Sequence, residues 1–413
     1  SLYLSAKLLG ETEFNAFQRG AAIVGIAFVV LLCSGYNFGQ REHLMTLMTV
    51  PFIILTALRA KGWTGSKGLV ICVAVLAGFG LFQKPFFLTV PIALEFWLQL
   101  RRFNIMRLFR LEMLVLLFGG LAYVACVLIF ARPYIFELLP QILSNYTAYN
   151  YPLSKALIYG LPRCIGIIFI VSVIMVLSKR LDREIPVLAK SFFIAAIGAY
   201  LSAVWQSKGW AYHVMPGNML LALSGMIVLL SWLGTEIKRQ WPIVLLAVLA
   251  VIINVPTRDH IVDHITDAKG VRTVAGLTDL MTGLGQDKTV FAFNTSPRNV
   301  MPAVVNADAR WSGKACCLHF VPSAVRFGSA ENKRVAKVQV DEIFASLLAR
   351  PPQLLIVDDS EKKLGFDGQE FDYFDYLRSQ YPVKLESLFS QYREIEAVED
   401  YRIFRLKDAQ NDR

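Results

Sequence analysis

Long apolar runs constrain this chain more than any other feature, because a helix needs about 20 apolar residues to cross a bilayer. Hydrophobic residues make up 55% of the 413 residues, more than soluble domains usually carry. Nine runs predict membrane spans, several of them short: residues 20–38, 44–58, 68–82, 86–100, 111–131, 156–178, 187–205, 214–234 and 241–255. The predicted fold class is an α-helical polytopic membrane bundle of about nine visible spans with a C-terminal soluble α/β domain.

The character of the sequence changes at residues 254–256, after which charged residues become frequent. Short apolar runs separated by turn residues then alternate with segments of helical spacing, and the runs expected to form strands are 289–293, 316–321 and 354–357. Strands that alternate with helices are typical of an α/β domain. The predicted domains are a transmembrane helical domain at 1–255 and an α/β domain at 256–413.

Positive charges divide the loops between the apolar runs into two alternating sets. One set carries twelve: Arg59, Lys61, Lys67, Arg101, Arg102, Arg107, Arg110, Lys179, Arg180, Arg183, Lys238 and Arg239. The other carries five: Arg41, Lys84, Arg132, Lys155 and Lys208. Loops rich in Lys and Arg stay in the cytoplasm. The poorer set of loops and the C-terminal domain are therefore expected on the outer side.

The composition also limits the partners. The net charge of +10 comes largely from the cytoplasmic loops, and no basic run with interleaved aromatic residues supports nucleic-acid binding. The adjacent Cys316 and Cys317 are unfavourably placed for a mutual disulfide, and no Cys-x-x-Cys spacing indicates a metal site. We therefore predict no nucleic-acid partner and no structural metal.

Four short outer loops, at 41–43, 84–85, 132–133 and 208–213, hold ionisable residues next to apolar spans, where charge is costly and by default marks a functional site. Three of these loops supply the candidate site residues. The residues concerned are Arg41, Glu42, His43, Lys84, Lys208, Trp210, Tyr212 and His213. The loop at 208–213 combines a lysine, an imidazole and two aromatic rings. Such a combination is suited to binding a phosphate group that lies beside a lipid chain and a sugar ring. A plainer explanation is an aromatic belt with snorkelling charges, which accounts for Trp210 and Tyr212 but not for Lys208 together with His213.

The order of these motifs resembles bacterial polytopic glycosyltransferases of the GT-C class. The matching residues are Gln40-Arg41-Glu42-His43, Lys84-Pro85 followed by Glu95, and the Lys-Gly-Trp-x-Tyr-His run at 208–213 followed by Pro216, with an α/β domain at the end. The resemblance implies a multi-pass protein of the bacterial inner (cytoplasmic) membrane with a periplasmic C-terminal domain. It also implies transfer of a sugar from a polyprenyl-phosphate donor to a cell-envelope glycan, lipid or protein on the periplasmic face.

The resemblance further implies roles for these residues. Arg41, His43, Lys84, Lys208, Trp210, Tyr212 and His213 are expected to bind substrate, chiefly the donor phosphate. Glu42 is the best visible catalytic acid, either as the general base or as a group that orients its neighbours. The main base of such enzymes lies in a first outer loop, which we expect upstream of Ser1. A divalent metal is compatible with this chemistry, and no other cofactor is expected.

Three other functions fit the same features. A transporter or flippase of lipid-linked sugars would also line a phosphate path with cations and aromatic residues, although no internal symmetry between the halves is apparent. A polysaccharide polymerase or ligase would share the polytopic form and the charged outer loops. A non-enzymatic scaffold would tolerate neutral residues in those loops.

Overall fold

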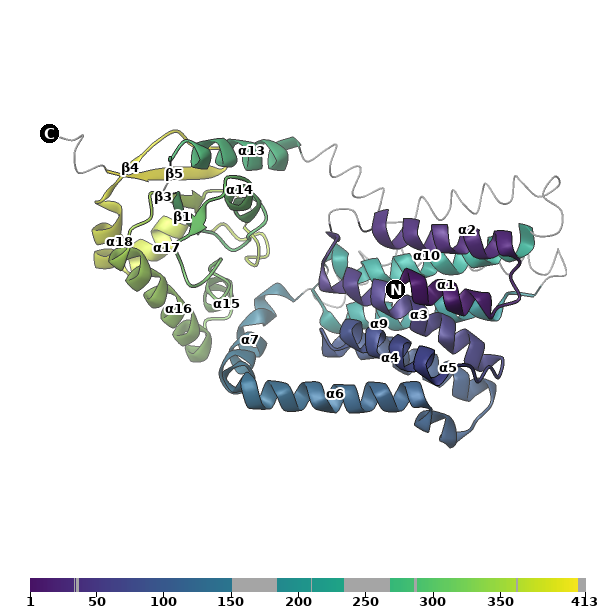
Figure 1. The fold of residues 1–413 in the computed structure, drawn as a ribbon. Coiled ribbons are helices and arrows are strands. Elements are labelled where there is room, and N and C mark those ends of the chain that lie inside the picture. Colours follow the sequence, from purple (N-terminus) through teal and green to yellow (C-terminus); the bar gives the residue numbers. More distant parts are fainter. Residues whose placement is uncertain are drawn as a thin grey trace. The chain divides into compact units, whose positions relative to one another are not determined.

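The computed structural model describes residues 1–150 and 184–233 apart from 33, 35, 36 and 209, and residues 268–407 apart from 286, 287 and 362. The chain divides into two compact units. The first comprises Ser1–Arg132 and Tyr151–Asp263, and the second comprises Pro133–Asn150 and His264–Arg413. Figure 1 labels their helices and strands.

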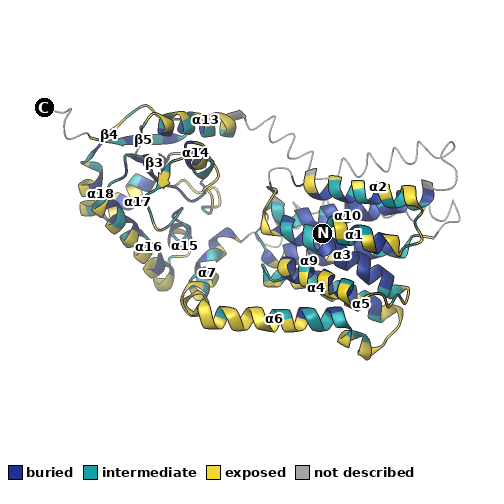
Figure 2. Cartoon of the chain, viewed as in Figure 1, coloured by how far each residue is buried: buried dark blue, intermediate teal, exposed yellow. Residues whose placement is uncertain are grey.

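The described part of the first unit is helical. Its helices are α1 (Leu2–Gly10), α2 (Ala16–Ala27), α3 (Arg41–Ala60), α4 (Lys67–Leu81), α5 (Thr89–Arg101), α6 (Leu111–Phe130), α9 (Val187–Gln206) and α10 (Ala211–Leu233). A π-helical turn, η1 (Phe28–Leu32), follows α2, and the 3-10 turns η3 (Pro85–Leu88) and η4 (Ile105–Phe109) precede α5 and α6. Helix α3 packs against α1, α4, α9 and α10, and every residue from Thr49 to Leu58 is buried (Figure 2).

Helix α3 passes through Pro51 without ending there. Proline has no N–H, so the Leu47 carbonyl, four residues earlier, loses its usual helical partner. The Ser1 hydroxyl donates a hydrogen bond to that carbonyl instead. Local satisfaction of the freed group explains how a proline can sit inside a fully buried helix.

The prediction of about nine spans is wrong. Within the described residues, four helices are long and apolar enough to cross a membrane, namely α3, α6, α9 and α10. The run at 20–38 becomes α2 and η1, and the runs at 68–82 and 86–100 become α4 and the pair η3–α5. Helix α4 ends because Gln83, Lys84 and Pro85 interrupt the apolar sequence. The spans expected at 156–178 and 241–255 lie outside the described residues.

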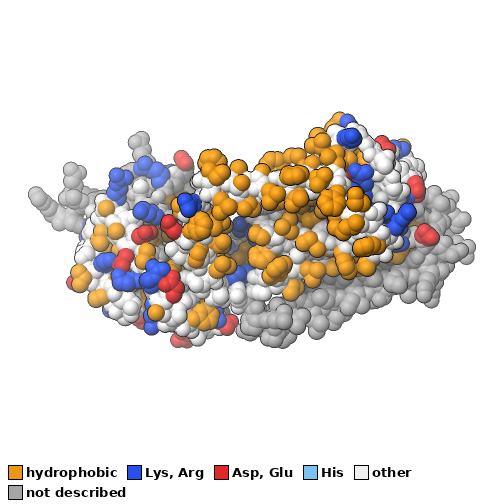
Figure 3. Space-filling model, turned by 90° about the horizontal axis from the view of Figure 1, so that it is seen from below, with side chains coloured by type: hydrophobic (Ala, Val, Ile, Leu, Met, Phe, Trp, Pro, Cys, Tyr) orange, Lys and Arg blue, Asp and Glu red, His pale blue; other side chains and the backbone are white. Residues whose placement is uncertain are grey.

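Helix α6 exposes apolar side chains along its length. Phe118 is 63% exposed, Ile129 is 70% exposed and Phe130 is 83% exposed. Figure 3 shows hydrophobic side chains spread over the face of the first unit that carries this helix. Exposed apolar surface of this extent marks a site of contact with membrane or protein.

The second unit contains a five-stranded sheet in the order β2-β1-β3-β5-β4. Its strands are β1 (Thr289–Phe293), β2 (Arg310–Trp311), β3 (Leu354–Asp358), β4 (Tyr392–Glu394) and β5 (Tyr401–Leu406). Strands β1, β2 and β3 are parallel, whereas β5 pairs antiparallel with both β3 and β4. Its helices are α7 (Leu139–Asn145), α13 (Ala268–Thr282), α14 (Val300–Asn306), α15 (Val321–Arg326), α16 (Ala330–Ala349), α17 (Tyr373–Gln380) and α18 (Pro382–Phe389).

Helices cover both faces of this sheet. Side chains alternate between the two faces along each strand, so one strand can contribute to a hydrophobic core on each face. Phe291 and Phe293 of β1 belong to one hydrophobic core with residues of α16, α17 and α18. Val290 and Ala292 belong to a second core with residues of α13 and α14. Burial on both faces explains why β1 and β3 are continuous apolar runs.

The run at 316–321, expected to be a strand, is instead a loop that leads into α15. Its Leu318 N–H donates to the Asn294 carbonyl at 2.7 Å, just after β1. Leu318 and Val321 are fully buried in the same hydrophobic core as Phe291 and Phe293, although they form no strand ladder. The apolar pattern is therefore real, but its cause is tertiary packing.

Candidate functional site

The candidate site begins at the start of α3. Gly39, with a φ of +79°, makes the turn before the helix. Glu42 lies in the first turn of α3 and is only 1% exposed. A carboxylate in this position is favoured by the helix dipole, which is positive at the N-terminus.

His43 holds this turn in place. Its Nδ1 accepts a hydrogen bond from the Gly39 N–H at 3.0 Å, and its Nε2 lies 2.8 Å from the Val30 carbonyl. A ring that accepts at Nδ1 and donates at Nε2 is the neutral form with the proton on Nε2. Both nitrogens are thus engaged with backbone, so we assign His43 a positioning role.

Lys84 brings two further elements to Glu42. Its Nζ forms an ion pair with Glu42 Oε1 and donates a hydrogen bond to Gln206 Oε1 at 3.1 Å. Gln206, the last residue of α9, is fixed by its own hydrogen bond to the Ser202 carbonyl at 3.2 Å. Burial lowers the pKa of Lys84 from its usual value, while the hydrogen bond with Glu42 opposes this shift. Residues of α3, η3 and α9 therefore meet at one buried cation.

The segment after α9 completes the group. His213 Nε2 lies 3.5 Å from Glu42 Oε1. The Tyr212 ring contacts the His213 ring edge-on with centroids 4.5 Å apart, and Lys84 Nζ lies 5.6 Å from the centre of the Tyr212 ring. Trp210 packs against both rings, at 5.5 Å from Tyr212 and 5.4 Å from His213. We name Glu42, Lys84, Gln206 and His213 the Glu42 cluster.

Two buried atoms of the Glu42 cluster have no hydrogen-bond partner among the described residues, Glu42 Oε2 and His213 Nδ1. Buried polar atoms are nearly always hydrogen-bonded in native proteins, so each exception needs an explanation. An acceptor oxygen and a ring nitrogen left open in the same group of side chains are suited to a ligand that offers hydroxyl groups.

Two further cations lie near this cluster. Arg41 is exposed at the first position of α3, and its guanidinium makes no ion pair with any described residue. Lys208 is half-buried, and burial lowers its pKa to about 8. The charges of Lys84, Lys208 and Arg41 all act on the His213 ring through space. Positive charges separated widely in sequence therefore lie near His213, and one of them, Lys84, pairs with Glu42.

The opposite end of α3 carries a separate charged network. Arg59 donates to both oxygens of Glu112 at 2.9 Å, and Arg110 Nε lies 3.3 Å from Glu112 Oε1. Arg110 also pairs with Glu95 of α5. This network ties α3, α5 and α6 together, and it accounts for Glu95 without any role beside Glu42.

The structure thus gathers most of the residues singled out in the sequence. Glu42, Lys84, Trp210, Tyr212 and His213 are in mutual contact, directly or through one neighbour, with Lys208 and Arg41 close by. His43 faces the backbone turn instead. Gln206 is the member that sequence analysis missed, since the only signal for it is its place just before the 208–213 segment. Comparison of the chain with protein-family models, curated proteins and solved structures yields no match.

Proposed function

We propose that this protein is a membrane glycosyltransferase that moves a sugar from a polyprenyl-phosphate donor to a hydroxyl group of a cell-envelope acceptor. The single observation that carries the proposal is the Glu42 cluster, in which a buried carboxylate keeps one oxygen open while Lys84 pairs with the other. The buried Glu95 also has one oxygen without a partner, so Glu42 is distinguished by its surroundings: it lies beside His213, whose ring also feels the charges of Lys208 and Arg41. The periplasmic side of the bacterial inner membrane is part of the proposal, and the uneven distribution of Lys and Arg between the loops supports it.

In this mechanism Glu42 Oε2 takes the proton of the acceptor hydroxyl as the acceptor oxygen forms its bond to the anomeric carbon of the sugar. The bond between that carbon and the phosphate oxygen breaks, and its electron pair leaves with the polyprenyl phosphate. Lys84 and Lys208 stabilise the growing negative charge, and Arg41 can bind phosphate oxygens bidentately. Trp210 and Tyr212 offer flat apolar faces to the sugar or the lipid.

Lys84 lies between the base and the expected position of the donor phosphate. In the free protein its ammonium group pairs with Glu42 Oε1. A donor phosphate competes for the same ammonium group. Donor binding would therefore release Glu42 from this ion pair before the sugar is transferred.

The test uses purified full-length protein in detergent with a polyprenyl-phosphate sugar and candidate acceptors. We expect sugar transfer, and we expect Lys208→Ala to slow it about a hundredfold by removing one charge-assisted contact to the leaving group. Lys190→Ala is a matched control, because Lys190 lies in the first turn of the same helix α9, whose far end leads to Lys208. Absence of transfer from any such donor, combined with donor movement across the membrane of proteoliposomes, would favour a flippase instead.

Lys208 also gives the proposal a pH dependence. With a pKa of about 8, Lys208 loses its positive charge in the free protein as the pH rises through that value. Donor binding should therefore weaken above pH 8, and KM for the donor should rise roughly tenfold by about pH 10. Lys208→Arg stays charged throughout and should flatten this rise. Steady-state KM values of both proteins across this range are the measurement, and an identical rise in the two would contradict the assignment.

A further inference from the structure

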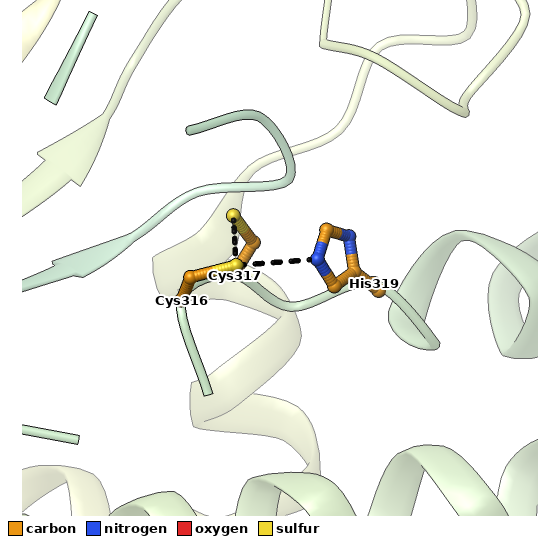
Figure 4. A group of neighbouring side chains, drawn as sticks. All are labelled: Cys316, Cys317 and His319. Carbon is orange, nitrogen blue, oxygen red and sulfur yellow. Dashed lines mark hydrogen bonds between the residues drawn. The ribbon is translucent and has the colours of Figure 1, made fainter. Parts of the chain in front are cut away.

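A second group of reactive side chains lies in the second unit, in the loop between β2 and α15. The thiol of Cys317 donates to Cys316 Sγ at 3.2 Å, and Cys316 Sγ lies 3.4 Å from His319 Nε2 (Figure 4). The three possible ligand atoms lie within 4.8 Å of one another. None of these residues takes part in the proposed sugar transfer.

The spacing of these atoms resembles that around a small tetrahedral metal ion. Zinc binds thiolate sulfur at about 2.3 Å and imidazole nitrogen at about 2.0 Å, which puts neighbouring ligand atoms roughly 3.5 to 3.8 Å apart. Two of the three distances between the ligand atoms, 3.2 and 3.4 Å, are shorter than this by a few tenths of an ångström, and the third is within 4.8 Å. Side-chain rotations would therefore be enough to place an ion among them.

The backbone of the loop is held in place around these residues. The Ala315 carbonyl accepts a hydrogen bond from the Trp311 ring at 2.9 Å. The Cys317 carbonyl accepts one from the Gln339 amide at 3.2 Å, and the His319 carbonyl accepts one from the Tyr149 hydroxyl at 3.1 Å. The Leu318 N–H donates to the Asn294 carbonyl at 2.7 Å, and the Phe320 N–H donates to Gln339 Oε1 at 3.2 Å. A loop fixed at successive residues presents its ligand atoms at little cost in conformational entropy.

The chemistry of the group selects the kind of ion. Two thiols and an imidazole favour zinc or monovalent copper over magnesium or calcium, which prefer oxygen ligands. No carboxylate joins the group among the described residues. Cys317 is fully buried whereas Cys316 and His319 are partly exposed, so the group is closed on one side and can be reached from the other.

We propose that Cys316, Cys317 and His319 bind one thiophilic d10 metal ion, best matched by Zn²⁺, with the fourth position open to water. The two thiols lose their protons to solvent on binding, and His319 coordinates through Nε2 as a neutral ring. The ion would brace the loop between β2 and α15, in which all three ligands lie. This site is independent of the Glu42 cluster, and the proposal replaces the expectation of no structural metal.

The experiment uses the full-length protein, reduced and freed of metal with a chelator, then exposed to Zn²⁺ or to Co²⁺ as a coloured substitute. We expect about one ion per chain by mass spectrometry of the metal, and thiolate-to-cobalt absorption in the near ultraviolet. Cys316→Ser and His319→Ala, at partly exposed positions, should each lose most of the bound ion. Cys72→Ser and Cys126→Ser, which remove free thiols elsewhere, should retain it.

Folding of each variant is checked by its melting temperature, since the buried Cys317 is less tolerant of change than its neighbours. Binding of Cu⁺ in place of Zn²⁺, with the same dependence on Cys316 and His319, would support the site. Equal metal content in Cys316→Ser, His319→Ala and the parent protein would overturn it. So would the absence of any bound ion in the reduced protein, or a thiol titration showing that Cys316 and Cys317 are joined as a disulfide.

Discussion

Glu42→Gln should lower the rate constant for sugar transfer by about a thousandfold, the range expected when a general base is removed. The amide has the shape of the carboxylate, and its oxygen can still accept the hydrogen bond from Lys84. The amide cannot, however, take up the proton of the acceptor hydroxyl at the position that Oε2 occupies in the parent protein. Because the amide binds substrates without a clash, kcat should fall far more than KM changes.

Glu95→Gln is a matched control for this substitution. Like Glu42, Glu95 is a buried carboxylate on a helix of the first unit, and one of its oxygens has no hydrogen-bond partner among the described residues. Its other oxygen pairs with Arg110 instead of a lysine. We expect its kcat to stay within a few-fold of the parent value once folded protein is compared. If Glu42→Gln kept a tenth of the parent rate or more, the base would have to be another group.

Glu112→Ala should be the most destabilising of the substitutions considered. Glu112 is 2% exposed and accepts both hydrogen bonds from Arg59, with Arg110 beside it. Its removal leaves the Arg59 guanidinium, whose side chain is only 14% exposed, without its carboxylate, and breaking a buried pair typically costs about 3–5 kcal/mol. Melting of the detergent-solubilised protein measures the loss, and transfer activity per folded molecule should change little.

The double variant Arg59→Leu/Glu112→Leu separates the pair from its surroundings. Replacing both partners by apolar residues removes the uncompensated charge, so much of the lost stability should return. Glu331→Ala breaks an exposed pair with Arg334 and should leave the melting temperature almost unchanged. A mild effect of Glu112→Ala, close to that of Glu331→Ala, would show that water reaches the Arg59 site.

Hydropathy located the long helices better than it counted them. The apolar run at 44–58 lies within α3, the run at 111–131 matches α6 to within one residue, and the 15-residue run at 68–82 matches α4 to within one residue at each end. The error was to count runs as short as 68–82 as spans, although about 20 apolar residues are needed to cross a bilayer. Local sequence pattern therefore gives the position of a helix more reliably than its relation to the membrane.

The candidate site was partly accessible from sequence for a different reason. Charged residues stand out against an apolar background, so Glu42, Lys84 and His213 could be selected without knowing that they touch. Gln206 and the backbone role of His43 depend on contacts made between helices and within the turn before α3, and no local pattern encodes them. Cys316 and His319 were likewise missed as a pair, because the expected ligand spacing was Cys-x-x-Cys.

Helix α3 is restrained at both of its ends. From Glu42 to Arg59 it rises roughly 26 Å, close to the thickness of the hydrocarbon core of a bilayer. Moving α3 along its axis by one helical turn would break the ion pair between Glu42 and Lys84 or the one between Arg59 and Glu112. If α3 spans a bilayer, these two pairs fix its position relative to the neighbouring helices. A change in bilayer thickness would then have to be accommodated by the other helices or by the lipid chains, and not by movement of α3.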